Sequence, residues 1–214
     1  MNLFLSRVHF PIRSLGPGRR LGIWFQGCGI RCPGCISADT WAGNRGKTTL
    51  ERLLARIAAW LPEAEGITIS GGEPFEQPDA LIALLEALRQ QTSVDILVYS
   101  GHPIEALTPT LAKASSLIDV LISDPFDLDA SHTRPLRGSD NQRMHLLTDL
   151  GRERFTQYDR LLAESDKSLD VMFDEAGSVW LAGIPSRGDF QRLKGLLNDE
   201  GHLVQISADK ARSR

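Results

Sequence analysis

The stretch that decides the fold is "GITISGGEPFEQPDALIALLEALRQQTSVDILVYS", residues 66–100. It opens with GITIS, a short apolar and β-branched run that is typical of a buried strand. The segment "PDALIALLEALRQQ" (78–91) predicts a helix, and "VDILVYS" (94–100) predicts a second buried strand. A strand, a helix and a strand in this order predict two parallel strands joined by a crossover helix.

The same alternation extends to both sides of this unit. Upstream, "TTLERLLARIAAWL" (48–61) has leucines at helical spacing, and Thr48 or Thr49 can cap the helix N-terminus. Downstream, residues 103–116 predict one or two short helical pieces, and "IDVLIS" (118–123) predicts a further strand. The middle of the chain therefore predicts an α/β fold with a parallel sheet. Active sites of such sheets lie at the carboxyl ends of the strands.

The two ends of the chain predict other elements. The segments "NLFLSRVHF" (2–10) and "RLGIWFQG" (20–27) predict an N-terminal pair of strands, and the polar residues 124–142 predict a long loop over the site. The rest predicts a helix over 152–164 and then a small β-β-α appendage. This consists of a hairpin over 168–184 that turns at 175–177 and a closing helix over 187–200, with Gly201 beyond its end. We therefore divide the chain into a core, 1–148, and a C-terminal α+β extension, 149–214.

Composition excludes several classes of function. The 214 residues are 42% hydrophobic and 24% charged, as expected for one globular domain with a small appendage. The net charge of -3 gives no reason to expect nucleic acid or a membrane surface as a partner. No apolar run approaches the ~20 residues that cross a bilayer, and we find no secretory signal peptide. We expect a cytoplasmic protein that binds neither nucleic acid nor membrane.

All the cysteines lie in "GCGIRCPGC", residues 27–35, where Cys28, Cys32 and Cys35 are spaced C-x3-C-x2-C. Thiolates are soft ligands that select iron–sulfur clusters, zinc or copper(I). A cubane cluster normally takes four cysteines, so three of them would leave one iron open. An open metal position suits catalysis, whereas a structural site closes its metal. The glycines between the cysteines let the backbone fold tightly around a bulky ligand.

Zinc remains an alternative at this point. His102 or His145 could complete a Cys3His site, and the chain would then be a zinc-stabilised interaction protein without turnover. Structural zinc more often uses paired CxxC motifs, and the sequence has no second pair. Three unrelated structural cysteines are less favoured still, because such residues are usually scattered along a chain. The spacing favours an iron–sulfur cluster.

The cysteine spacing resembles the radical S-adenosylmethionine (radical SAM) superfamily when it is taken together with "SGGEPFEQ" (70–77), "VYSGH" (98–102), "LISDPF" (121–126) and "LRGSDNQ" (136–142). The resemblance covers about residues 1–147 and is strongest to the small single-cluster branch. That branch includes the activating proteins of anaerobic ribonucleotide reductase and, more distantly, of pyruvate formate-lyase. The fold that the resemblance implies is a partial (β/α) barrel with an N-terminal strand pair and the small appendage described above.

The resemblance also implies a chemistry. Cys28, Cys32 and Cys35 would bind a [4Fe-4S] cluster, and SAM would bind the open iron. Reductive cleavage of SAM would yield a 5′-deoxyadenosyl radical that abstracts a hydrogen atom from the substrate. The substrate would be a glycine Cα–H of a glycyl-radical enzyme, and a flavodoxin or ferredoxin would supply the electron. Because the smallest activators lack a segment like 149–214, modification of a peptide or a small metabolite is the alternative.

Two groups of residues are candidates for the site. The first group would contact SAM: Ser70, Gly71, Gly72, Glu73, Pro74, Ser100, Ser123 and Asp124. Within it, Gly71, Gly72 and Glu73 would meet the ammonium group of SAM. Ser100, Ser123 and Asp124 would reach its ribose or carboxylate. The two later serines and Asp124 could otherwise be helix caps. The second group would line the site or orient a substrate, or otherwise belong to a solvated loop: Arg137, Asn141 and Gln142.

Three further residues flank the motifs. The wider superfamily prefers an aromatic residue where this chain has Gly34, whereas the ribonucleotide reductase activators share the Pro-Gly found here. This departure therefore points to that branch. We expect Trp24 in the core, and Trp41 either shielding the cluster or facing a partner.

Overall fold

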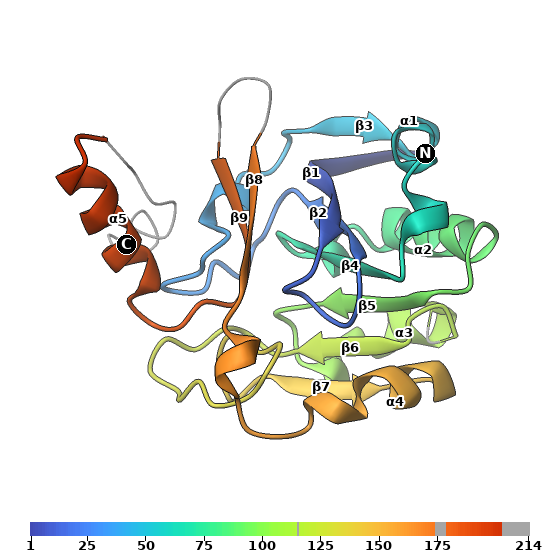
Figure 1. The fold of residues 1–214 in the computed structure, drawn as a ribbon. Coiled ribbons are helices and arrows are strands. Elements are labelled where there is room, and N and C mark those ends of the chain that lie inside the picture. The colour runs from blue at the N-terminus through green and yellow to red at the C-terminus, as the bar shows by residue number, and fades with distance from the viewer. Residues whose placement is uncertain (115, 174–178, 203–214) are drawn as a thin grey trace.

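The computed structural model describes residues 1–114, 116–173 and 179–202 (Figure 1). It contains a seven-stranded sheet in the order β3-β1-β2-β4-β5-β6-β7 and a separate two-stranded sheet, β8-β9. The strands are β1 (Asn2–Ile12), β2 (Arg20–Phe25), β3 (Lys47–Thr49), β4 (Gly66–Gly71), β5 (Asp95–Tyr99), β6 (Val120–Ser123), β7 (Arg143–Leu146), β8 (Leu169–Phe173) and β9 (Val179–Gly183). The helices are α1 (Leu50–Ile57), α2 (Pro78–Arg89), α3 (Thr108–Ala114), α4 (Asp149–Phe155) and α5 (Asp189–Asp199).

The centre of the large sheet is parallel, as the alternation of strands and helices predicts. Strands β2, β4, β5 and β6 lie side by side in parallel, with Ile23 opposite Ile69 and Leu97 opposite Val120. The N-terminal strand pair is also confirmed, because β1 runs antiparallel to β2. The protein is thus a mixed α/β structure in which the carboxyl ends of four parallel strands share one edge.

Apolar side chains from helices pack against both faces of the large sheet. Helices α1, α2 and α3 pack their leucines against alternate strand residues such as Ile23, Ile69 and Val98. On the other face, Phe155 of α4 is fully buried against β5 and β6. Arg20, also fully buried, pairs with Asp95 at 2.6 Å, and Arg154 of α4 pairs with the same carboxylate. Helix α4 is therefore anchored to the sheet by both apolar contacts and ion pairs.

Several elements differ from the predictions. Strands β3 and β7 were not expected; they are short and partly polar, and antiparallel pairing with β1 and β6 creates them. Helix α1 begins after Thr49, whose side chain caps it as predicted, but it ends at Ile57. Beyond it, residues 61–63 form a 3-10 turn that contains a proline, and proline cannot continue a helix by normal hydrogen bonding.

The helix predicted over 152–164 is wrong in both bounds. It begins earlier, because the Thr148 hydroxyl accepts a hydrogen bond from the Gly151 N–H at 3.1 Å. It ends at Phe155, which turns into the core. Residues 156–158 and 164–166 then form 3-10 turns, and Arg160 pairs with Asp166 at 2.6 Å.

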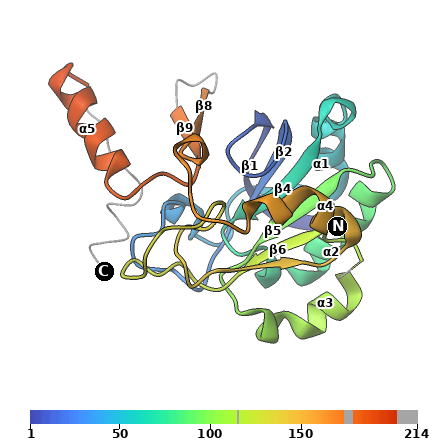
Figure 2. The ribbon, with the colours of Figure 1, turned by 60° about the horizontal axis from the view of Figure 1, so that its bottom comes forward.

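The β-β-α order near the C-terminus is as predicted. Strands β8 and β9 pair antiparallel, while the turn predicted at 175–177 lies outside the described residues. Helix α5 is followed by Gly201 in the left-handed region, at φ 86°, a common way to end a helix. In both Figure 1 and Figure 2, α5 lies away from the seven-stranded sheet. Within the described ranges, no helix is long and apolar enough to cross a bilayer.

Candidate active site

The cysteine loop follows β2 and is closed at its base by its own return segment. The Gly27 N–H donates to the Thr40 carbonyl at 2.7 Å, and the Cys28 N–H donates to the Trp41 carbonyl at 3.2 Å. The side chain of Gln26 donates to the carbonyl of Ala42 at 2.7 Å. These bonds hold the three thiols in one short loop at the carboxyl edge of the sheet.

Burial controls the ionisation of the three thiols. It raises the pKa of Cys28 and Cys32, and raises that of Cys35 to about 11. Nearby backbone N–H groups oppose part of this rise; for Cys32 one of them belongs to Phe126, in the loop that follows β6. Metal ligation needs thiolates, and the positive charge of bound iron would offset the cost of ionising them.

A single metal ion and a cluster make different demands on the three thiols. A zinc ion would require the thiolates and a fourth donor around one point. Among the described residues, no three His, Cys, Asp or Glu side chains gather in that way. A cubane binds each thiolate through a different iron atom, so its ligands surround the group at a wider spacing.

The Gly-Gly pair after β4 packs against the base of the cysteine loop. Gly71 has φ 112°, in the left-handed region, and a Cβ there would clash with the backbone of Phe25. A Cβ on Gly72 would clash with the Gly27 carbonyl. The Gly72 N–H donates to the Phe25 carbonyl, and the Glu73 N–H donates to the Gly27 carbonyl, both at 2.8 Å. The glycines therefore join two of the predicted motifs directly.

Glu73 lies beneath this junction and is only 1% exposed. One carboxylate oxygen accepts from the Ser100 hydroxyl at 2.9 Å and the Phe75 N–H at 3.0 Å; the other accepts from the Gly101 N–H at 2.7 Å. Burial raises the pKa of Glu73, and these hydrogen bonds counteract part of the rise. The structure thus brings the predicted residues Glu73 and Ser100 together.

Glu76 is a residue of the candidate site that the sequence interpretation missed. Its two carboxylate oxygens both accept from the Gly29 N–H, at 2.9 Å, inside the cysteine loop. His102 lies 3.8 Å from the same carboxylate. The only signal in the sequence is its place three residues after Glu73, within the quoted motif. Glu76 fixes the segment between the first two cysteines.

Ser123 and Asp124 end β6 in a cluster of polar groups. The Ser123 hydroxyl donates to Asp124 at 2.7 Å and lies 2.9 Å from Nε2 of His145. Arg143 pairs with Asp124 at 2.7 Å and, bidentately, with Glu105 at 2.8 Å. Although burial opposes it, the hydrogen bonds from Arg143 and Ser123 lower the pKa of Asp124. The carboxylate is therefore ionised at neutral pH.

Asp124 also has φ 83°, which is uncommon for a residue with a side chain. His145 and Arg143 come from the strand that the sequence interpretation did not expect. Their contribution to this edge of the sheet was therefore missed along with the strand.

The loop predicted over 124–142 lies between β6 and β7 and packs on the cysteine loop. A Cβ on Gly34 would lie 3.0 Å from the side chain of Leu128, and Gly34 itself has φ 75°. Asn141 donates to the Pro125 carbonyl at 2.8 Å. Gln142 accepts from the Gly138 N–H at 2.7 Å. Both amide side chains thus hold the loop itself together.

Arg137 differs from its two neighbours in the motif, because it is buried and only 6% exposed. It lies 4.0 Å from Asp159. Its Nε makes no hydrogen bond within the described part of the chain.

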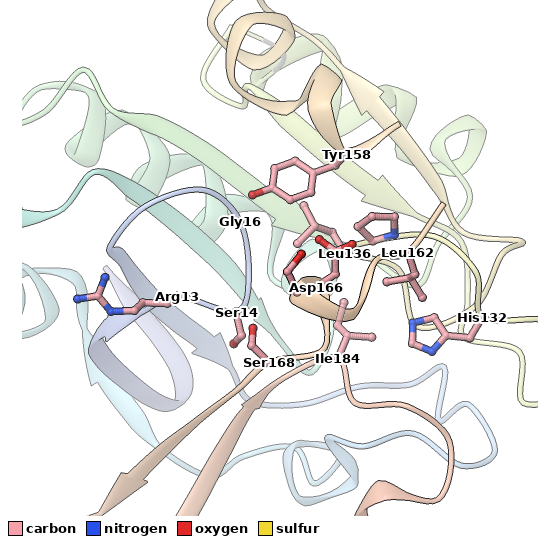
Figure 3. Close-up of a pocket in the computed structure, with 12 residues that line it drawn as sticks. Arg13, Ser14, Gly16, His132, Leu136, Tyr158, Leu162, Asp166, Ser168 and Ile184 are labelled. Carbon is pink, nitrogen blue, oxygen red and sulfur yellow. The ribbon is translucent and has the colours of Figure 1, made fainter. Parts of the chain in front are cut away.

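A separate hollow lies between the core and the residues that lead to β8 (Figure 3). Its volume is about 90 Å³, and Ser14, His132, Tyr158 and Ser168 are among the side chains that line it. The described lining includes none of the cysteines and none of the candidate SAM contacts. The hollow is therefore distinct from the edge where the motifs meet.

Comparison with known proteins supports the motifs. A family model described as a 4Fe-4S single cluster domain matches residues 14–145, which include all three cysteines. The anaerobic ribonucleoside-triphosphate reductase-activating protein of Salmonella typhi is 31% identical over 148 residues, which cover 65% of this chain and 96% of that protein. The pyruvate formate-lyase-activating enzyme of Clostridium pasteurianum is 38% identical over 121 residues, half of each chain.

A solved structure gives a weaker likeness. The crystal structure of QueE from Escherichia coli has a TM-score of 0.40 and 21% identity, over 47% of this chain and 53% of that one. The family match rests instead on sequence, since it spans the cysteine loop, the Gly-Gly junction and the ends of β5 and β6. This chain belongs to the 4Fe-4S single cluster family, in the radical SAM branch of the glycyl-radical activating enzymes, with a [4Fe-4S] cluster and SAM as its cofactors.

Proposed function

We propose that this chain reductively cleaves SAM at its cluster and places a radical on a glycine of a glycyl-radical enzyme. The observation that carries the proposal is the direct bonding of the cysteine loop to the Gly-Gly strand end, through Gly72 and Glu73. It brings the cluster ligands and the candidate SAM contacts to one edge of the sheet. When bound, the two cofactors supply the electron and the 5′-deoxyadenosyl radical for hydrogen abstraction.

Cys28, Cys32 and Cys35 would hold the cluster. The loop fits such a group because its three half-buried thiols are paired with backbone N–H groups, and because Glu76 restrains Gly29 from outside the loop. Ionised thiolates would be stabilised by the iron and by those N–H groups together.

The candidate SAM contacts would form a negative lining beside the cluster. A carboxylate offers about four acceptor positions, and Glu73 uses three of them on Ser100, Phe75 and Gly101. We propose that the remaining position accepts a hydrogen bond from the ammonium group of SAM. We assign the remaining contacts to the backbone at 70–72 and Pro74, and to Ser123 and Asp124 at the end of β6.

The substrate proposal comes from the relatives. The names of two of them specify activation of anaerobic ribonucleoside-triphosphate reductase and of pyruvate formate-lyase. A glycine without a side chain can reach a recessed site more easily than other residues can. We further propose that the large sheet curves as a partial (β/α) barrel, that Arg137 faces the substrate, and that a flavodoxin or ferredoxin donates the electron.

A second candidate is modification of a peptide or a small metabolite. The observation that favours it is the chain beyond residue 145, which lies outside the family match. The division into a core, 1–148, and an extension, 149–214, also remains our proposal. With this division, α4 would belong to the extension although it packs on the large sheet of the core.

The test is anaerobic purification, reconstitution with iron and sulfide, and reaction with dithionite and SAM. We expect 5′-deoxyadenosine, detected by mass spectrometry, from the unaltered protein and none from Cys32→Ala, because the variant loses a cluster ligand. An unaltered chain that binds zinc instead, or holds a cluster without cleaving SAM, would refute the enzyme proposal. A glycyl radical seen by electron paramagnetic resonance after a glycyl-radical enzyme is added would select the first candidate over the second.

A further inference from the structure

The β8–β9 hairpin is attached to the turn that follows β1. The Asp170 carboxylate accepts from the Arg13 N–H at 2.8 Å, the Ser14 N–H at 2.9 Å and the Ser14 hydroxyl at 2.6 Å. One carboxylate thus satisfies three donors from a segment more than 150 residues earlier in the chain. Hydrogen bonds to a charged acceptor are stronger than neutral ones, so this contact fixes where the hairpin lies.

An apolar cluster seals the same junction. It combines residues of the hairpin with residues of the N-terminal strand pair, all at most 6% exposed: Ile12, Leu15, Trp24, Met172 and Ala182. Trp180 and Ile184 pack against its margin. The inner face of the hairpin is therefore buried against β1 and β2, as the proximity of these strands in Figure 2 illustrates.

Trp180 brings the hairpin into contact with Arg7 of β1. The guanidinium carbon of Arg7 lies 4.0 Å from the centre of the Trp180 ring and 5.7 Å from that of Trp24. A guanidinium over an indole face is held by cation–π attraction. The Arg7 side chain is only 17% exposed, so its contacts restrict it to few rotamers.

Arg7 in turn holds the return segment of the cysteine loop. Its Nη2 donates to the Asp39 carboxylate at 2.6 Å. Asp39 lies in the 3-10 turn Ala38–Thr40, and the Thr40 carbonyl accepts from the Gly27 N–H at the base of the loop. A continuous series of contacts thus leads from the hairpin to the residue before Cys28.

We propose that the β8–β9 hairpin braces the cluster loop: Trp180 restrains Arg7, and the ion pair of Arg7 with Asp39 keeps the loop closed around its cluster. The proposal rests on the proposed function, in which the three cysteines hold that cluster. It assigns a structural role to the β8–β9 hairpin, which lies wholly beyond the family match that ends at residue 145. Trp180, Arg7 and Asp39 are positioning residues, since none of them is a cysteine or a candidate SAM contact.

The first measurement is the rate at which an iron chelator removes the cluster from the reconstituted full chain without oxygen. We expect Trp180→Ala to release iron about fivefold faster, which corresponds to ~1 kcal/mol at 1.4 kcal/mol per tenfold. Asp39→Asn should have a similar effect. The double variant should be no faster than the faster single one, because both changes break the same series of contacts. An unchanged rate in Trp180→Ala, or rates that multiply in the double variant, would overturn the brace.

The matched control is Trp60→Ala. Trp60 also lies beside an arginine, Arg56, at 5.2 Å, and it packs against the helix-covered core instead of the hairpin. Its loss should lower the overall stability of the protein and leave the rate of iron release unchanged. Equal acceleration in both tryptophan variants would show a general loss of stability and would count against the brace.

A second readout separates the brace from the proposed function. In the metal-free protein, we expect the Gly27 and Cys28 amides to exchange hydrogen faster in Trp180→Ala and in Asp39→Asn than in the unaltered chain. The Ser14 amide, bonded to Asp170, reports whether the hairpin stays attached, and Asp39→Asn leaves that attachment intact. If the unaltered chain takes up no cluster but these amides respond, the proposed function fails and the brace stands. If a cluster binds and neither rate nor exchange responds, only the brace fails.

Discussion

The parallel core and the C-terminal hairpin are buried to very different degrees. Core strand residues such as Ile69 and Val98 are fully buried beneath α1, α2 and α3. In the described part of the hairpin, Met172 and Ala182 are buried, while Val171 and Val179 are more than half exposed. The core therefore supplies most of the free energy of folding, whereas the hairpin buries its apolar side chains only by packing against the core. This difference predicts that changes near the cysteine loop affect global stability, and that changes in the extension act locally.

Among the variants that test this contrast between the two regions, we expect Gly72→Ala to change stability the most. The new methyl group would clash with the Gly27 carbonyl, where the Gly-Gly strand end packs on the cysteine loop. Forcing an extra methyl into such a contact costs ~1–3 kcal/mol, so the midpoint of urea unfolding should fall and cluster uptake should decrease.

Gly195→Ala, in α5, is the matched control for that change. Among the described residues, and apart from its chain neighbours and the backbone of α5 itself, no atom lies within 4 Å of the Cβ it would add. The same chemical change is thus made in the extension. Alanine favours a helix over glycine by ~0.5–1 kcal/mol, so this variant should be slightly more stable and bind its cluster normally. Equal destabilisation by the two variants would contradict the contrast between the regions.

The next effect concerns pH and the Cys35 thiol in the metal-free protein. Burial raises its pKa from 9.0 to about 11, so the unfolded chain loses this proton at lower pH than the folded chain. The stabilising contribution is therefore complete below about pH 9 and is lost as the pH rises toward about 11. Urea unfolding at about pH 7 and about pH 10 should show a fall in stability that is smaller in Cys35→Ala. A fall of the same size in the variant would assign the pH dependence to other groups.

The smallest effect is expected from Trp41→Phe. The indole N–H of Trp41 is buried close enough to Cys35 to lower the pKa of that thiol, yet within the described chain it makes no hydrogen bond of good geometry. We expect it to donate to the sulfur once a cluster is bound. Because a hydrogen bond to sulfur is stronger in the reduced, more negative cluster, its loss should lower the one-electron reduction potential, by at most about 40 mV for a bond worth ~1 kcal/mol. A redox titration followed by electron paramagnetic resonance measures this potential, with Trp60→Phe as the control; an unchanged potential would contradict the assignment.

Much of the core could be predicted from the order of residues along the chain. Residues 66–100 predicted two parallel strands and their helix, and the structure confirms all three elements. The spacing of the cysteines and the motif at 70–77 indicated one branch of one superfamily, which the family match and the activating-enzyme relatives together confirm. Such signals are local: they come from periodicity within one element, or from residues adjacent in one loop.

The tertiary structure alone decided which distant groups meet. Glu76 reaches Gly29 across 47 residues, Arg7 reaches Asp39 across 32, and Asp170 reaches Arg13 across 157. Strands β3 and β7 likewise exist because a neighbouring strand offers hydrogen bonds to them.

The sequence by itself determined the central parallel strands and helices, the cysteine loop and the family. Their patterns arise from side-chain spacing that a single segment carries. Only the tertiary structure decided what holds that loop closed and where the hairpin is attached. Those contacts depend on how the segments pack together. The sequence position of a carboxylate or an arginine does not indicate which distant residue it will contact.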